Sequence, residues 1–198
     1  IYRASLNLKE PFARAVQLDM NLHQAELAYH SDWPQLREVS GHLFINNAKV
    51  AANLASAKIF DTNVNNARVD VNPKSDGQGS LLSITANLNG AASDGLRILR
   101  EGALRRYIGN SMDSWFMSGA INTELNLVVP LGTKNPDEDA HQQIAIDIQP
   151  TQFDLQNLNL QLSDLTGRIS YSNKTGLLSE NLQGDLFNQH INAQLKSI

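Results

Sequence analysis

The sequence contains no cysteine among its 198 residues, which excludes disulfide bonds, thiolate metal ligands and cysteine nucleophiles. No segment approaches the run of about 18 apolar residues that a membrane-spanning helix needs. Aromatic residues make up only 6% of the chain although 41% is hydrophobic, so any apolar surface must be mainly aliphatic. The net charge of −4 provides no positive field for a phosphate backbone, and we expect no nucleic acid as a partner.

Alternation of apolar and polar residues is the strongest pattern that the sequence does contain. A period of two residues predicts β-strands with one buried and one solvated face. In clear examples, aliphatic residues alternate with mostly polar ones over 16–22, 82–88, 121–131 and 144–148. The sequence therefore predicts a mainly β protein.

Short segments rich in Gly, Pro, Asn and Asp lie between these runs. Three of them are 72–79, 132–140 and 172–176. Consecutive strands that are joined by such short turns form an antiparallel meander.

The alternation changes phase once, after residue 155. Phe153 and Leu155 have the opposite parity to the leucines of 158–162. An extra residue in one strand changes its parity in this way, so we predict a β-bulge near Gln156 and Asn157.

One segment departs from the strand pattern and predicts a helix within 93–109. A capping residue, Ser93 or Asp94, precedes it, and Gly109 offers a stop signal. Its apolar positions at helical spacing are Leu96, Leu99, Ala103 and Tyr107. A further short helical turn is predicted at Trp115–Phe116.

No pattern in the sequence predicts catalysis, a metal site or a cofactor. The five histidines are scattered and show no metal-ligand spacing. No serine lies in a G-x-S-x-G elbow. The acidic loop 134–140 could hold a hard cation, but it lacks the ligand register and central glycine of a calcium loop, which favours a plain acidic turn. We expect a protein that is not an enzyme.

A strand-and-turn pattern occurs twice in the chain. Leu36, Val39, Gly41, Leu43 and Asn47 recur 126 positions later as Leu162, Leu165, Gly167, Ile169 and Asn173. After one added residue, Ala57, Ile59, Phe60 and Val64 recur as Gly184, Leu186, Phe187 and Ile191. Duplicating such a unit lengthens a sheet, because each unit buries its edge against the next.

The apolar faces of the predicted strands are the candidate binding surface. An aliphatic face with few aromatics suits an acyl chain, whose burial needs only apolar surface. The alternative is the closed core of an ordinary β-sandwich. The candidate lipid-binding residues, which share one parity on neighbouring strands, are Ile121, Leu125, Leu127, Val129, Ile144, Ile146, Ile148, Leu160, Leu162 and Ile169.

Three stretches of the chain, in this order, resemble the bacterial YhdP-like proteins of the AsmA-like superfamily. They are "LAYHSDWPQLREVSGHLFINNAKV", "SMDSWFMSGAINTELNLVVPLG" and "LSDLTGRISYSNKTGLLSENLQGDLF". The resemblance extends from about Ala25 to Leu195. It implies a long, twisted antiparallel sheet that curves into an open groove, with one principal helix.

The resemblance also implies a function, a location and a division of the chain. Such proteins are anchored in the inner membrane of Gram-negative bacteria and extend through the periplasm as a lipid conduit, so this chain would be an internal segment. The expected parts are a first groove repeat at 1–92, a helical insertion or cap at 93–118 and a second groove repeat at 119–198. The expected partners are phospholipid acyl chains, membranes through parts of the full protein absent here, and further copies of the segment through its sheet edges.

Two other functions remain open on the sequence alone. One is a structural or adhesive β-repeat module that binds proteins through its edges. The other is an enzyme acting on a periplasmic glycan or lipid. A cleft with converging polar groups would favour the enzyme, whereas an accessible apolar face would favour the conduit.

Overall fold

A computed structural model of the chain describes residues 2–5, 15–28, 34–101, 110, 113–132 and 140–196. Within this part of the chain, twelve β-strands form one antiparallel sheet. The strands are β1 (Tyr2–Ser5), β2 (Ala15–Leu27), β3 (Leu36–Asn46), β4 (Lys49–Ile59), β5 (Thr62–Pro73), β6 (Ser80–Ala91), β7 (Trp115–Ser118), β8 (Ala120–Leu131), β9 (His141–Leu155), β10 (Leu160–Ser172), β11 (Gly176–Leu186) and β12 (Gln189–Lys196). A helix α1 (Ala92–Glu101) and a 3-10 turn η2 (Gln156–Leu158) complete the described elements.

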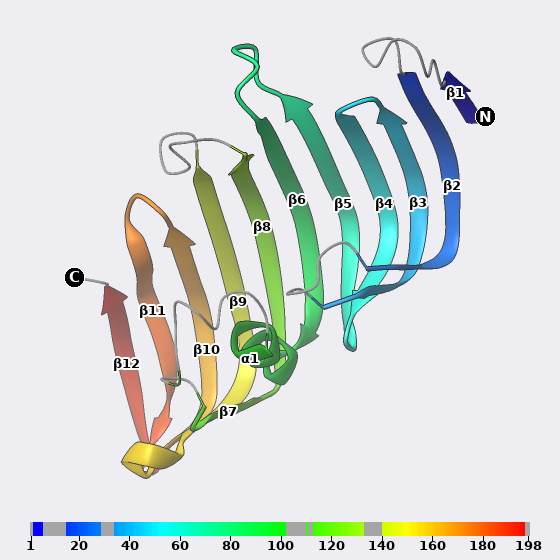
Figure 1. Cartoon of the computed structure of the whole chain (residues 1–198). Coiled ribbons are helices and arrows are strands. Elements are labelled where there is room, and N and C mark those ends of the chain that lie inside the picture. Colours follow the sequence, from blue (N-terminus) through cyan, green and yellow to red (C-terminus); the bar gives the residue numbers. More distant parts are fainter. Residues whose placement is uncertain are drawn as a thin grey trace.

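The sheet is a meander in which spatial order follows chain order (Figure 1). Each strand pairs with the next along the chain, except that α1 and β7 intervene between the paired strands β6 and β8. The sheet does not close into a barrel, and β1 and β12 lie at its opposite ends. The predicted antiparallel meander with an open groove and one principal helix is confirmed.

The turn predictions can be compared with the strand ends. β5 ends at Pro73 and β6 begins at Ser80, so the first turn segment is confirmed. β10 ends at Ser172 and β11 begins at Gly176, which confirms the third. Most of the second, including 133–139, lies outside the described residues.

Two local predictions are wrong. Trp115–Phe116 is not a helical turn, because these residues form β7 and pair with Leu155 and Asp154 at the end of β9. The phase change near Gln156 is not a bulge within one strand: η2 turns the chain back, and β10 then pairs with β9. A bulge within one strand and a turn between two strands both shift the apolar residues between odd and even positions, so the sequence pattern did not distinguish them.

Helix α1 leaves the sheet directly after β6. It begins at Ala92, so Ser93 and Asp94 lie in its first turn rather than before it. The remaining predicted helical residues, 102–109, lie outside the described residues. Among the described residues, no helix is both long enough and apolar enough to cross a membrane.

The recurring glycine and asparagine of the internal repeat make equivalent backbone contacts in both copies. Gly41 in β3 and Gly167 in β10 each bring the neighbouring strand so close that an added Cβ would lie 2.3 Å and 2.2 Å, respectively, from a backbone carbonyl oxygen. The Asn47 Oδ1 accepts the Val16 N–H at 2.9 Å, and the Asn173 Oδ1 accepts the Gln142 N–H at 3.1 Å. The recurring glycine and asparagine therefore hold strand contacts rather than a chemical site.

Candidate functional site: the apolar face of the sheet

Cross-strand register joins aliphatic residues into rows that run across the sheet, from strand to strand. One row consists of Leu18, Ile45, Val50, Val71, Leu82 and Val129. The next consists of Met20, Leu43, Ala52, Val69, Ile84 and Leu127. Successive residues of a strand point to opposite faces, so these rows lie on one side, which we call the apolar face.

All ten candidate residues from the sequence lie on this face. Val129 and Leu127 belong to the two rows above, and Leu125 pairs with Ile144. The pairs Ile121 with Ile148 and Ile146 with Ile169 follow along the strands. Leu160 and Leu162 continue the face at the far end of β10, opposite Leu155 and Phe153.

Sequence reasoning placed the candidate surface only in the second half of the chain, whereas the apolar face continues through the first half. The alternation of apolar and polar residues in β2 and β6 could have revealed this first half of the face. Burial is greatest in this first half, where a cluster of buried residues is centred on β3 to β6. These buried residues are Val39, Leu54, Ala57, Val64, Ala67, Ala86 and Leu88. The first half therefore forms the better-packed part of the face.

The face is more accessible over β8 to β10. Nine of the ten candidate residues are half-buried, and only Ile148, 5% exposed, is buried. Half-burial leaves aliphatic surface that a further apolar group can cover. This part of the face, like the two half-buried rows that cross β2 to β8, can therefore accept an apolar ligand.

Aromatic residues complete one end of this mainly aliphatic face. The Trp115 and Phe153 rings meet edge to face, with centroids 5.4 Å apart. Trp115 comes from β7, which pairs with the last residues of β9. The sequence prediction missed Trp115 because it assigned that residue to a helical turn.

Helix α1 covers another part of the same face. A Cβ added at Gly95 would lie 3.2 Å from the Ile121 side chain, so the helix backbone passes closely over that residue. Ala92 and Leu96 are buried. The Thr62 hydroxyl donates a hydrogen bond of 2.9 Å to the Asp94 carboxylate, which ties the helix to the β4–β5 turn. The helix therefore limits access to the face at this end of the strands.

The opposite face of the sheet is polar and carries side-chain ladders. Asn65 donates to Asn89 at 2.8 Å, and Asn89 donates to Asn122 at 2.7 Å, which links β5, β6 and β8. Arg168 bridges Asp147 at 2.7 Å and Glu124 at 3.0 Å. The charge of Asp147 and the hydrogen bond to Glu124 raise the pKa of Arg168 above its ordinary value.

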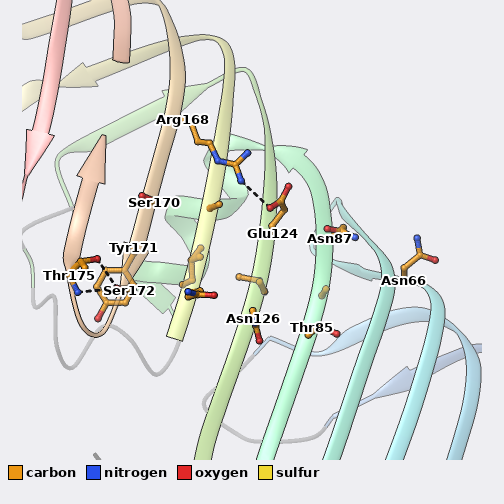
Figure 2. A pocket seen from close by; sticks show the side chains of 15 residues that line it. Asn66, Thr85, Asn87, Glu124, Asn126, Arg168, Ser170, Tyr171, Ser172 and Thr175 are labelled. Atoms are coloured by element: carbon orange, nitrogen blue, oxygen red, sulfur yellow. Dashed lines mark hydrogen bonds and ion pairs between the residues drawn. The ribbon is translucent and has the colours of Figure 1, made fainter. Parts of the chain in front are cut away.

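A hollow of about 700 Å³ lies over this polar side (Figure 2). Its lining includes Asn66, Thr85, Asn87, Asn126 and the Arg168–Glu124 pair, together with residues of the β10–β11 turn. Among the described residues of this lining, Arg168 pairs with Glu124 across the strands and the Ser172 hydroxyl lies 2.7 Å from the Thr175 hydroxyl, and neither contact joins a nucleophile to a base. The arrangement binds strand to strand and offers no converging set for bond chemistry.

The described part of the chain contains no candidate metal site. Within it, no three histidine, aspartate or glutamate side chains gather as a metal-ligand group. The acidic loop, apart from Ala140, lies outside the described residues, so its cation site stays a prediction.

A protein-family model matches nearly the whole chain. The family model described as YhdP protein matches residues 5–197. No curated protein and no solved structure has significant similarity to the chain. The resemblance inferred from the three sequence stretches is confirmed.

Proposed function

Because the chain belongs to the YhdP protein family, we propose that it is a non-enzymatic segment of a conduit that carries phospholipid between the inner and outer membranes. In this proposal acyl chains lie on the apolar face, and the polar face contacts water. The protein that contains the segment is anchored in the inner membrane and extends through the periplasm.

The observation that carries the proposal is the continuity of the apolar rows across the strands. The face reaches β11 through Leu186, which pairs with Leu162, so apolar positions extend from β2 to β11 over eight strand spacings of about 4.8 Å, or about 40 Å in total. A bilayer core of about 30 Å contains two opposed layers of tails, so one tail is about 15 Å long. The face therefore exceeds the length of a phospholipid tail and supports movement along the sheet.

A conduit of this kind needs no catalytic residue. Burial of hydrocarbon contributes about 25 cal/mol for each Å² removed from water, without a requirement for directional contacts. Uniform aliphatic rows give a lipid tail similar contacts at each position along the sheet, so no single position binds the tail much more tightly than the others. This favours passage over storage.

The test compares neighbouring residues that point to opposite faces of β8. A photo-crosslinking amino acid at Leu125 or Leu127 should label phospholipid in cells, whereas the same group at Asn122 or Asn126 should not. Equal labelling from both faces would contradict the proposal and favour the alternative, a structural module that binds proteins through its sheet edges.

Charge substitution provides the functional measurement. Leu127→Asp places a carboxylate against hydrocarbon, at a desolvation cost of several kcal/mol, and should impair the outer-membrane permeability barrier. Asn126→Asp, one residue away on the polar face, is the matched control and should leave the barrier intact. Normal transport by a folded Leu127→Asp protein, with its thermal unfolding unchanged, would refute the conduit.

A further inference from the structure

Two turns in the molecule are equivalent by the internal repeat but have different surroundings. Phe60 begins the β4–β5 turn and Phe187 begins the β11–β12 turn, with left-handed φ values of 54° and 53°. The pair Ile59–Thr62 flanks the first turn, and the pair Leu186–Gln189 flanks the second. The two backbones therefore present the aromatic residue in the same way.

The first turn is covered by a helix. The Arg97 guanidinium of α1 lies 3.9 Å from the centroid of the Phe60 ring, a cation–π contact. Asp94, one helical turn earlier, accepts hydrogen bonds from the Asp61 N–H at 3.2 Å and from the Thr62 hydroxyl at 2.9 Å. Phe60 is half-buried as a result.

The second turn has no such cover among the described residues. Phe187 is 74% exposed, the largest exposure among the exposed large hydrophobic residues that the structure describes. It lines a hollow of about 410 Å³ together with Asp154 and Asp185. The Asp185 carboxylate lies 3.1 Å from the His190 Nδ1 and keeps 39% of its side chain exposed.

The charged groups around the two turns differ. By the repeat, Lys58 occupies the position of Asp185 and Arg37 that of Ser163. Arg37 donates to the Phe60 carbonyl, and Lys58 forms an ion pair with Glu38 at 2.9 Å. The bases at the first turn are therefore paired with the carboxylates of Asp61 and Glu38, whereas the second turn presents the carboxylates of Asp154 and Asp185, with His190 beside Asp185.

A second exposed phenylalanine extends the surface. Phe116 pairs with Asp154 in the register of β7 and β9 and is 47% exposed. The Arg100 guanidinium lies 5.6 Å from its ring centroid. Phenylalanine rings in this structure thus already bind arginines of a helix at two places.

We propose that the surface formed by Phe116, Asp154, Asp185 and Phe187 binds a cationic α-helix of a partner protein. One arginine of that helix lies over the Phe187 ring and pairs with the two carboxylates, as Arg97 lies over Phe60. The carboxylates select a helix with more positive charge than α1, whose Asp94 and Glu101 offset its two arginines. This interaction is separate from lipid binding, because the surface lies at the strand ends and polar residues make up most of the lining of the hollow, with Leu160 as its one candidate lipid-binding residue.

The probe is a hydrocarbon-stapled helical peptide with the sequence of residues 90–103 carrying Asp94→Asn and Glu101→Gln, which removes both acidic charges. Its binding to the full 198-residue chain is measured by fluorescence anisotropy and by amide chemical shifts. We expect shifts at 185–189 and not at 58–62. Phe187→Ala, or Asp154→Asn with Asp185→Asn, should weaken binding at least tenfold.

The control is Leu158→Ala, which removes another exposed apolar side chain, 61% exposed, from the adjacent turn η2. It should leave the dissociation constant unchanged. A peptide with Arg97→Met should bind at least tenfold more weakly than its parent. Absence of binding, equal affinity for the Phe187→Ala protein, or an equal loss in Leu158→Ala would overturn the proposal.

Discussion

Replacing Gly167 with alanine should separate β10 from β11. The new Cβ would lie 2.2 Å from the Asn181 carbonyl oxygen and 3.1 Å from the Leu182 Cα, whereas ordinary contacts begin at 3.4 Å. Both obstacles are backbone atoms, so the strands must move apart by about 1 Å and lose adjacent ladder hydrogen bonds, each worth about 0.5–1.5 kcal/mol. Gly167 also has φ +133°, which strains an L-residue by about 1–3 kcal/mol.

Two lost bonds and the strain together predict a loss of about 2–6 kcal/mol. Gly77→Ala is the matched control: its φ is +70° and no heavy atom lies within 4 Å of an added Cβ, so only about 1–2 kcal/mol of strain is expected. Urea unfolding followed by circular dichroism measures both, and hydrogen exchange of β11 detects a local opening. If the two variants unfold at the same urea concentration with equal exchange in β11, the close approach of the strands has no energetic role.

Three further predictions follow from the same contacts. Asn173→Ala should cost about 1–3 kcal/mol in urea unfolding because its side chain makes two hydrogen bonds to the backbone before and at the start of β9, and Asn47→Ala should cost a similar amount because it loses one such bond and leaves alanine at a φ of 53°; a loss below about 0.5 kcal/mol in both would show that these contacts do not hold the strands. Thr62→Val should speed amide exchange in α1 because its hydrogen bond to Asp94 is lost, whereas Thr62→Ser should preserve slow exchange; identical rates would mean that the bond does not hold the helix. The isolated chain should associate through its edge strands as concentration rises in analytical ultracentrifugation, since among the described strands β12 pairs only with β11; a monomer at the highest concentration would contradict this.

Much of the sheet could be predicted because the alternation of apolar and polar residues is visible within each strand and determines which side chains face the same side of the sheet. Residues such as Leu125 and Leu127 share parity, and chain-order pairing then places their face beside that of Ile144. No knowledge of distant contacts was needed, since each strand meets the next one along the chain. Eight of the ten candidate residues fall on one face by these two facts, whereas Leu160 and Leu162 have the opposite parity to Ile169 in β10 and reach the same face through the register shifts between Leu162 and Gly167.

The parts that could not be predicted depend on contacts between distant residues. Trp115 becomes a strand residue because the end of β9 offers it a partner, and four residues are too few for a periodic signal. The position of α1 on the sheet depends on the contact of Arg97 with Phe60, and no residue spacing in the sequence indicates that contact. The left-handed residues Glu38 and Asp164 lie at equivalent irregularities of the two repeats, but glutamate and aspartate carry no strong signature for that conformation.

The chain-order pairing of the sheet determines how the molecule responds to mechanical tension. Its two ends lie at opposite edges, so a pull between them loads the outermost strands first (Figure 1). Each strand is held mainly by its two neighbours, and an edge strand such as β12 by one, so the ladder hydrogen bonds there open one after another. Releasing β11, a strand of 11 residues, lengthens the chain by about 36–40 Å. A sheet of this design yields in successive small steps at low force, and the strands that remain paired keep their alignment.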